Sequence, residues 1–343
     1  MNKSCVYQVL SLSISFEILG AAGHDNALWA RVDSGQSIRR LLFDCGENTA
    51  SSISFGDLQQ TDHLFFSHLH MDHIAGFDAY FRATFNREKP NEIWGPPQTG
   101  EILSQRFRGY MWNLHHGIPG AFRVHDIDER EIRSQRWATD EAFATAHDDG
   151  SKPREKTVVE TPDFTVECLT MNHGTPSLAY VVREKPRRNI DTEKLQRLGL
   201  RTGAWLKQLR NPAPGQTAIE IDGVSHPLQP LRDELMVEVP GWSIGYLTDF
   251  LLDAPSMERA AEFVRGSKTL VCESQYRHAD LELATRNFHM TAKQAGELAA
   301  RAVVGEMILF HVSERYTPEV WQEMLREAKA VFPRTRFAEH WKI

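Results

Sequence analysis

Short apolar runs and stretches of helical spacing follow one another along the chain. Residues 6–20 alternate between apolar and polar positions, which predicts a strand with one buried face. Residues 64–67 form a short run of apolar residues, the length of a strand buried on both faces. Further strands are predicted at residues 27–32, 40–44, 93–97, 124–127, 157–159, 164–171, 178–183, 243–247, 269–272 and 307–310.

Apolar residues recur at helical spacing from Ile74 to Phe85, and helices are also predicted at residues 101–110 and 255–265. Thr291 and Gln294 form a capping box at the start of a helix over residues 292–303. The last long helix, residues 318–331, has proline in its first turn, a favoured position for that residue.

Strands followed by helices occur twice, which favours two packed sheets with helices outside. We therefore expect an α+β fold, an αββα sandwich, and a single domain over residues 1–343. Residues 184–233 are rich in Pro, Arg and Lys without strong periodicity, and we expect an irregular excursion from the domain there. The polar run 148–156 is predicted to be an exposed loop.

Composition places the chain among globular proteins. It has 343 residues, 41% apolar residues and a net charge of −7, which excludes a disordered chain and argues against a generic polyanion binder. A local basic groove stays possible. The chain has no apolar run near the ~20 residues that a membrane helix needs. Because the first apolar run reads as a strand rather than a signal peptide, we expect a cytoplasmic protein.

Cysteine and histidine differ in what they suggest. The four cysteines are far apart and form no Cys-x-x-Cys pair, which disfavours a thiolate zinc site and a disulfide framework. The 15 histidines, in contrast, are unevenly spread. Histidine chemistry is therefore the place to look for function.

Residues 67–73, with the sequence SHLHMDH, place three His and one Asp directly after a buried strand. In an extended loop, His68 and His70 point the same way, while Asp72 and His73 turn the other way into a helix. This spacing offers two nitrogen ligands to one metal and a nitrogen–oxygen pair to a second. Zinc, iron and manganese accept such ligands. The alternative is a polar helix entry with surface histidines.

Residues 68–73 resemble the H-x-H-x-D-H motif of the metallo-β-lactamase superfamily, whose fold is a four-layer αββα sandwich. Within it, the ribonuclease Z branch is the most similar. The likeness spans nearly the whole chain and rests on FDCGE at 43–47, WGPP at 94–97, NFHMTA at 287–292 and HVSERY at 311–316.

This resemblance implies two divalent metal ions, zinc first, with manganese or iron as alternatives. One ion would be bound by His68, His70 and His173 and the other by Asp72, His73 and His311, with Asp249 bridging them. Such metal pairs activate water and polarise a phosphoryl oxygen.

The resemblance also implies catalytic roles. Asp72 would hydrogen-bond the attacking hydroxide, and His289 would protonate the leaving oxygen, a step suited to imidazole near neutral pH. Glu273 would orient His289, although it also fits a surface carboxylate at a strand end.

Three further residues would assist. Ser313 and Arg315 would hold a phosphate, although Arg315 equally fits a structural ion pair. Asp44 fits a residue that steadies a metal-bound histidine better than it fits a ligand.

Two enzymatic functions and one non-enzymatic function follow. The first is a ribonuclease Z-like phosphodiesterase, an endoribonuclease acting on tRNA precursors at their 3′ ends. Residues 23–28, where this branch carries Lys and Arg, contain neither, and the chain is acidic. Both observations favour a second function, the hydrolysis of small phosphodiesters or other small esters. The third is a binding protein without catalysis. The branch often forms homodimers, which makes a homodimer a further expectation.

Overall fold

The computed structural model describes residues 14–34 and 37–343. The described chain divides into two compact units: one ends at Glu184 and resumes at Trp242, and the other is Lys185–Gly241. The strand predicted at residues 6–20 is present as β1 (Ile14–Leu19), and its residues 6–13 lie outside the described range. None of the described helices is both long and apolar enough to cross a membrane.

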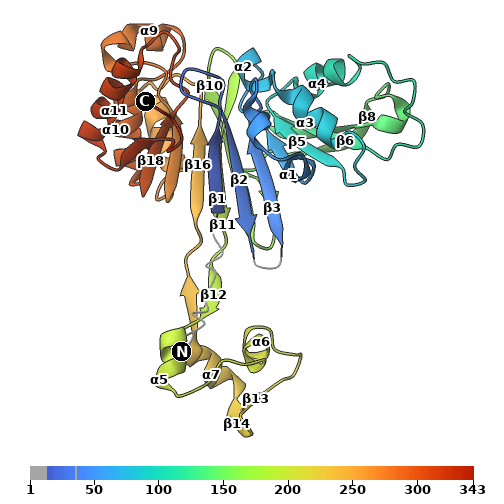
Figure 1. Cartoon of the computed structure of the whole chain (residues 1–343), viewed down its shortest axis with the longest axis vertical. Coiled ribbons are helices and arrows are strands. Elements are labelled where there is room, and N and C mark those ends of the chain that lie inside the picture. Colours follow the sequence, from blue (N-terminus) through green and yellow to red (C-terminus); the bar gives the residue numbers. More distant parts are fainter. Residues whose placement is uncertain (1–13, 35–36) are drawn as a thin grey trace, which may run out of the picture. The chain divides into compact units, whose positions relative to one another are not determined.

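The first sheet belongs to the first unit and is built in chain order, β1 to β8 (Figure 1). Its central strands β3 to β6 are parallel, while both flanks are antiparallel. Its remaining strands are β2 (Ala27–Asp33), β3 (Ile38–Phe43), β4 (His63–Phe65), β5 (Asn91–Gly95), β6 (Ala121–Ile127), β7 (Glu131–Ala138) and β8 (His147–Pro153).

The second sheet lies in the same unit and has the order β19-β18-β17-β16-β11-β10-β9. Strands β16 to β19 are parallel, and β9 to β11 continue the sheet in antiparallel pairs. Its strands are β9 (Thr157–Glu160), β10 (Phe164–Asn172), β11 (Pro176–Glu184), β16 (Ser243–Leu247), β17 (Thr269–Glu273), β18 (Glu306–Phe310) and β19 (Thr335–Phe337).

Helices cover the outer face of each sheet, so the predicted αββα sandwich is confirmed. Helices α1, α3 and α4 pack on the first sheet, and α8, α10 and α11 pack on the second (Figure 1). The helices of this unit are α1 (Phe55–Gln59), α2 (Met71–Ile74), α3 (Phe77–Thr84), α4 (Thr99–Phe107), α8 (Ala254–Phe263), α9 (Leu281–Arg286), α10 (Ala292–Ala302) and α11 (Pro318–Val331), with 3-10 turns at Thr49–Ser52, Thr139–Glu141 and His278–Asp280.

Helix α10 illustrates how local sequence decides packing. Its predicted capping box is confirmed, with Thr291 and Gln294 exchanging side-chain and backbone hydrogen bonds. A Cβ added at Gly296 would lie 2.8 Å from the carbonyl oxygen of Ala328 in α11, so only glycine allows this approach. The two helices therefore pack closely over the second sheet.

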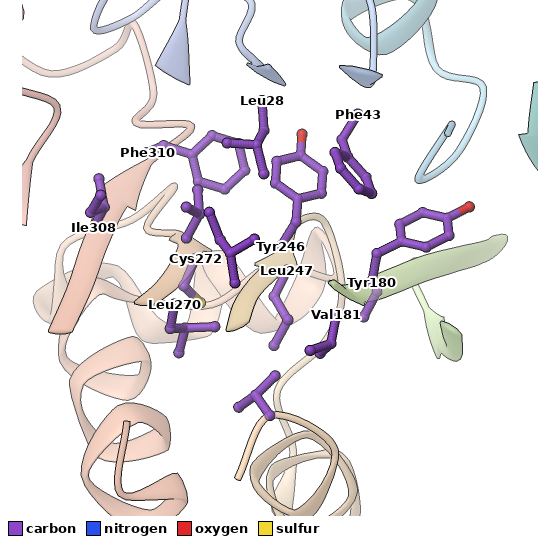
Figure 2. Packing of buried hydrophobic residues seen from close by; sticks show 14 of the residues in the cluster. Leu28, Phe43, Tyr180, Val181, Tyr246, Leu247, Leu270, Cys272, Ile308 and Phe310 are labelled. Atoms are coloured by element: carbon purple, nitrogen blue, oxygen red, sulfur yellow. The ribbon is translucent and has the colours of Figure 1, made fainter. Parts of the chain in front are cut away.

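The core between the sheets consists of aromatic and branched residues from both inner faces (Figure 2). Phe43 and Phe65 of the first sheet stack with ring centroids 4.9 Å apart. Tyr180 of the second sheet contacts both rings, at 5.5 and 5.2 Å. Burying such large apolar surfaces is the main stabilising contribution to folding and fixes one sheet against the other.

The order and direction of the strands bring the predicted site residues to one edge of the sandwich. Strands β3 and β4 are parallel in one sheet, and β16, β17 and β18 are parallel in the other. Asp44, the 67–73 loop, Asp249, Glu273 and His311 stand at the carboxyl ends of these five strands or just after them. The carboxyl ends of parallel strands share an edge, which is where α/β folds form their sites.

The loop predicted at 148–156 is wrong, because β8 occupies most of it and pairs with β7. Its sequence, HDDGSKP, lacks apolar residues, and six of its seven positions are exposed. As an edge strand it is held by backbone hydrogen bonds to β7 and by ion pairs of Asp149 with Arg123 and Arg136, and it needs no apolar face. The sequence of β8 therefore shows no alternation of apolar and polar residues, which is why the strand was not predicted.

The second unit is more regular than the excursion predicted over residues 184–233. Its small core contains Leu195, Trp205, Leu209 and Leu235. The elements are too short to show clear periodicity in sequence. They are β12 (Arg187–Ile190) paired with β15 (Met236–Val239), β13 (Ala218–Ile221) paired with β14 (Val224–Pro227), α5 (Thr192–Arg197), α6 (Trp205–Arg210) and α7 (Leu228–Leu235).

Candidate metal centre

The 67–73 loop is fixed by the turn that follows β3. The backbone N–H of Cys45 donates to the carbonyl of His73, and the N–H of Gly76 donates to the carbonyl of Cys45. A Cβ on Gly46 would lie 2.3 Å from the carbonyl oxygen of Asp72, so the two segments touch only because this residue is glycine. The turn at residues 43–47 thus fixes the backbone of the histidine-rich loop by hydrogen bonds and close packing.

One group of candidate ligands consists of His68, His70 and His173. Their nearest ring nitrogens all lie within 4.8 Å of one another. His68 is completely buried, whereas His70 is exposed at the start of α2. His173 follows β10 and comes from the other sheet, so the group joins both halves of the sandwich.

The second group consists of Asp72, His73, Asp249 and His311, again with ligand atoms within 4.8 Å. The Oδ2 atom of Asp249 lies 3.4 Å from Nε2 of His73. The same oxygen lies 3.7 and 3.8 Å from Nε2 of His68 and His173, which belong to the first group. Asp249 therefore lies between the two groups, where a bridging carboxylate would be needed.

The free nitrogens fit divalent metal ions. Nε2 of His68 and of His73 are buried without a hydrogen-bond partner, although buried polar atoms are normally satisfied. On the opposite side of each ring, Nδ1 is held, by Ser67 Oγ at 3.1 Å and by Asp44 Oδ2 at 2.9 Å respectively. In His173, Nδ1 donates to the carbonyl of Phe288. These contacts leave Nε2 as the unprotonated atom, as metal coordination requires.

The electrostatics agree with this donor set. Burial lowers the pKa of His68 well below its usual value, and burial together with the charge of His173 lowers that of His70. Burial would raise the pKa of Asp249, but the neighbouring charges of His311 and His73 hold it well below its usual range. His68 and His70 are thus neutral imidazoles and Asp249 is an ionised carboxylate, the forms that bind metal. Burial would lower the pKa of His73 and of His311, but the charges of Asp44 and Asp249 raise the first and that of Asp249 raises the second, so this second group favours a positive charge.

Three residues of the site adopt left-handed backbone conformations. Asp44, Asp249 and His311 have φ angles of 60°, 51° and 52°. Each follows a strand, and such values are costly for residues with a Cβ, by about 1 kcal/mol or more. The strand ends therefore turn sharply, which directs these side chains toward the centre.

Asp44 belongs to neither group of candidate ligands but contacts both, His73 directly and His68 through Ser67. Its Oδ2 accepts hydrogen bonds from Ser67 Oγ at 2.7 Å, His73 Nδ1 at 2.9 Å and Tyr246 Oη at 2.8 Å. Its Oδ1 accepts one from the backbone N–H of Ser67 at 2.7 Å. The expectation that Asp44 contacts a histidine of the site agrees with this geometry.

Sequence reasoning missed two residues that support the site. Tyr246 carries no signal in a buried strand and reads as core. Asn26 is 2% exposed; its Oδ1 accepts the backbone N–H of His311 at 3.1 Å, and its Nδ2 donates to the carbonyls of Leu19 and Ala21. The partner of Tyr246 at the site, Asp44, and that of Asn26, His311, each lie more than two hundred residues away in sequence, so only the folded chain reveals these contacts.

His289 and Glu273, predicted as a pair, lie in contact. Nδ1 of His289 is 2.8 Å from Oε2 of Glu273, and the other carboxylate oxygen accepts the N–H of Phe250. Glu273 is completely buried, which rules out the surface carboxylate of the alternative interpretation. Burial would lower the pKa of His289, but the charge and hydrogen bond of Glu273 outweigh it and raise the pKa to about 9.

Ser313 and Arg315 lie next to each other after His311. The Nε–H of Arg315 donates to Ser313 Oγ at 2.9 Å, and its guanidinium lies 4.9 Å over the ring of Tyr276. These contacts hold the arginine in place, and its predicted role toward a phosphate stays a prediction.

Relatives of this chain cover nearly all of it. A protein named ribonuclease Z from Deinococcus radiodurans is 46% identical over 96% of this chain and 98% of its own length. A ribonuclease Z from a Synechococcus strain is 31% identical over 87% of this chain and 85% of its own. A family model described as "Anti-Pycsar protein Apyc1" matches residues 23–171.

Solved structures share the fold at low identity. The metallo-beta-lactamase fold protein YhfI from Bacillus subtilis has a TM-score of 0.55 and 17% identity, covering 94% of this chain and 95% of its own. The short form of human tRNase Z has a TM-score of 0.52 and 15% identity, covering 94% and 96%. Fold and relatives together define a metal-dependent hydrolase of the metallo-β-lactamase fold. Within that class, the chain belongs to the ribonuclease Z family, as its motifs predicted.

If Asp249 bridges two metal ions, its replacement by Asn should lower the metal content of the purified protein. Asn tolerates the left-handed backbone of this position, so the loss would be that of the charge. Elemental analysis should find about two ions per chain in the wild type and at most one in Asp249→Asn. The control is Asp253→Asn, which makes the same change at the N-cap of α8. Equal metal content in all three proteins would contradict the bridging role.

Proposed function

We propose that this protein is an endoribonuclease that cleaves tRNA precursors at their 3′ ends with two zinc ions. The observation that carries this proposal is the 46% identity to a ribonuclease Z over nearly the whole of both chains. The two groups of candidate ligands around Asp249 support it, because phosphodiester hydrolysis is a reaction that paired metal ions promote.

The proposed ligand set follows the two groups. His68, His70 and His173 would hold one ion, and Asp72, His73 and His311 the other, with Asp249 between them. When bound, the ions would supply Lewis acidity toward the phosphoryl oxygen and lower the pKa of water. Nitrogen and carboxylate ligands without cysteine fit zinc, and manganese or iron remain the alternatives.

The chain's own residues would complete the reaction. Asp72 is half-buried and its Oδ2 lies 3.3 Å from Nε2 of both His73 and His311, where it can hold the attacking water by a hydrogen bond. His289, held at Nδ1 by Glu273, has Nε2 available to give a proton to the leaving oxygen. Ser313 and Arg315 would hold a phosphate near the site.

The second unit supports an RNA substrate through its charge. Residues 185–241 contain nine Lys and Arg against seven Asp and Glu, although the whole chain has a net charge of −7. Five of these cations lie between residues 192 and 211, where Glu193 is the sole acid. Arg201, Lys207 and Arg210 are exposed. We propose that this basic segment contacts the phosphate backbone of RNA.

A second candidate function is the hydrolysis of small phosphodiesters. It is favoured by the loop at residues 23–28, which has no Lys or Arg and instead carries Asp25. The carboxylate of Asp25 accepts the N–H of Glu47 at 2.7 Å. A Cβ added at Gly46 would lie 2.5 Å from Cβ of Asp25 and 2.3 Å from the carbonyl oxygen of Asp72, so Asp25 lies close to the candidate metal centre. Burial and the charge of Asp72 raise the pKa of Asp25. An acid there disfavours a long polyanion.

The cytoplasmic location and the homodimer expected from the sequence stay predictions. RNA processing agrees with the first, and gel filtration of the purified protein would test the second.

Metal-loaded protein should cleave a tRNA precursor at the 3′ end of the tRNA at low salt, and EDTA should abolish cleavage. His68→Ala should lose nearly all activity, because its Nε2 would no longer bind metal. Gel electrophoresis of a labelled precursor measures both. Hydrolysis of bis-p-nitrophenyl phosphate and of cyclic nucleotides is the comparison: activity on these with an intact precursor would favour the second candidate.

Removing two exposed cations from α6 should weaken RNA binding but leave small substrates unaffected. For Lys207→Ala/Arg210→Ala we expect KM for the precursor to rise several-fold and its salt dependence to become shallower, by about 0.7–0.9 in the log–log slope for each lost phosphate contact. The matched control is Arg326→Ala/Lys329→Ala, an exposed pair with the same spacing on α11. Equal effects of both pairs would argue against a role of the second unit.

The pH profile tests the acid. His289 must be protonated to act, so the rate should fall as pH rises past its pKa. Glu273→Gln removes the charge that raises this pKa to about 9, so the alkaline limb should move to lower pH. We also expect kcat to fall about ten- to a hundredfold. Glu306→Gln, at the start of β18 and away from the site, should leave the profile unchanged.

A further inference from the structure

Two tyrosines of the second sheet reach across the core toward the first. Tyr180 of β11 and Tyr246 of β16 are direct partners in antiparallel register. Their side chains are fully buried, with at most 1% exposed. Figure 2 shows the ring of Tyr246 beside Phe43 and Phe310, with its hydroxyl directed toward the strands of the first sheet.

The two hydroxyls differ in what they bind. Tyr180 donates to the backbone carbonyl of Phe66 at 2.8 Å, which joins the sheets but touches no side chain of the site. Tyr246 donates to Oδ2 of Asp44, also at 2.8 Å. The acceptor of Tyr246 is a completely buried carboxylate, and hydrogen bonds to a charged group are about twice as strong as neutral ones.

The carboxylate of Asp44 determines which ring nitrogen carries the proton in one histidine of each candidate metal group. It accepts the Nδ1 proton of His73 directly, which leaves Nε2 of that ring free. It also accepts the hydroxyl proton of Ser67, so that Ser67 Oγ is left to accept from Nδ1 of His68. A change in the orientation of this one carboxylate would therefore reach both groups.

We propose that Tyr246 is a positioning residue of the metal centre. Its hydroxyl holds the Asp44 carboxylate in the orientation that keeps the Nε2 atoms of His68 and His73 unprotonated and aimed at the metals. Without it, the buried carboxylate loses one of four donors, and its hold on both rings weakens. The inference rests on the ligand assignment of the proposed function and is independent of the RNA substrate.

The experiment compares Tyr246→Phe with Tyr180→Phe in the full-length protein. Both variants keep the ring and lose one buried hydroxyl, so both metal-free proteins should lose free energy of unfolding in urea, Tyr246→Phe more than Tyr180→Phe because its acceptor is a carboxylate. Only Tyr246→Phe should bind metal more weakly, by about tenfold, the lower end of the range for residues that support metal ligands. Zinc affinity is measured by competition with a chromophoric chelator, after folding has been checked by circular dichroism.

Cobalt(II) gives a second readout that a merely structural role would not change. Its visible absorption reports ligand geometry, and Tyr246→Phe should alter the spectrum while Tyr180→Phe should not. In an Asp44→Asn background, the further change Tyr246→Phe should have no added effect on affinity, because the carboxylate it acts through is gone.

The proposal is wrong if Tyr246→Phe binds zinc and cobalt as the wild type does, or if Tyr180→Phe weakens binding by the same factor. It is also wrong if the two changes in Asp44→Asn/Tyr246→Phe are simply additive. None of these measurements involves RNA. A protein that binds metal as expected but leaves tRNA precursors intact would refute the proposed substrate and not the role of Tyr246.

Discussion

The carboxylate of Asp249 is almost completely buried and lies within 3.8 Å of imidazole nitrogens from both sheets. Burying an ionised carboxylate is costly unless opposite charge or hydrogen-bond donors surround it. The surrounding groups come from β4, β10 and β18, so they meet only when the two sheets hold one fixed position. The aromatic core between the sheets supplies that position, and the left-handed turns at the strand ends aim the side chains. Core packing and site chemistry are thus parts of one arrangement.

Much of this arrangement could be predicted from sequence, because ligands at a short spacing leave a strong local signal. The loop at residues 67–73 indicated two metal groups, and the resemblance to the metallo-β-lactamase superfamily implied Asp249 and His311. The supporting residues were not predictable in this way. Tyr246 looks like any buried strand residue, and its partner Asp44 is 202 positions away. Sequence periodicity also failed at β8, where backbone pairing and ion pairs make the strand without an apolar face, and in residues 185–241, whose elements are short.

The net charge of the chain hides a division between its two units. Acidic residues predominate in the unit that carries the candidate metal centre, whereas the smaller unit has an excess of cations. Averaged over the chain, the two give a value that argues against a nucleic-acid partner. The charge of each unit is more informative than the net charge of the chain, since attraction between exposed charges is screened over about 8 Å at physiological salt.

The spread of the site along the chain has a consequence for how the protein matures. His311 faces Asp72 across 239 positions of sequence, so a chain emerging from the ribosome displays HLHMDH long before the second group is complete. If these histidines bind metal as proposed, they can capture an ion only loosely during that interval. Tight binding would then wait until β18 has joined the second sheet. Metal retention would mark completed folding, and a truncated or misfolded chain would lose its ions.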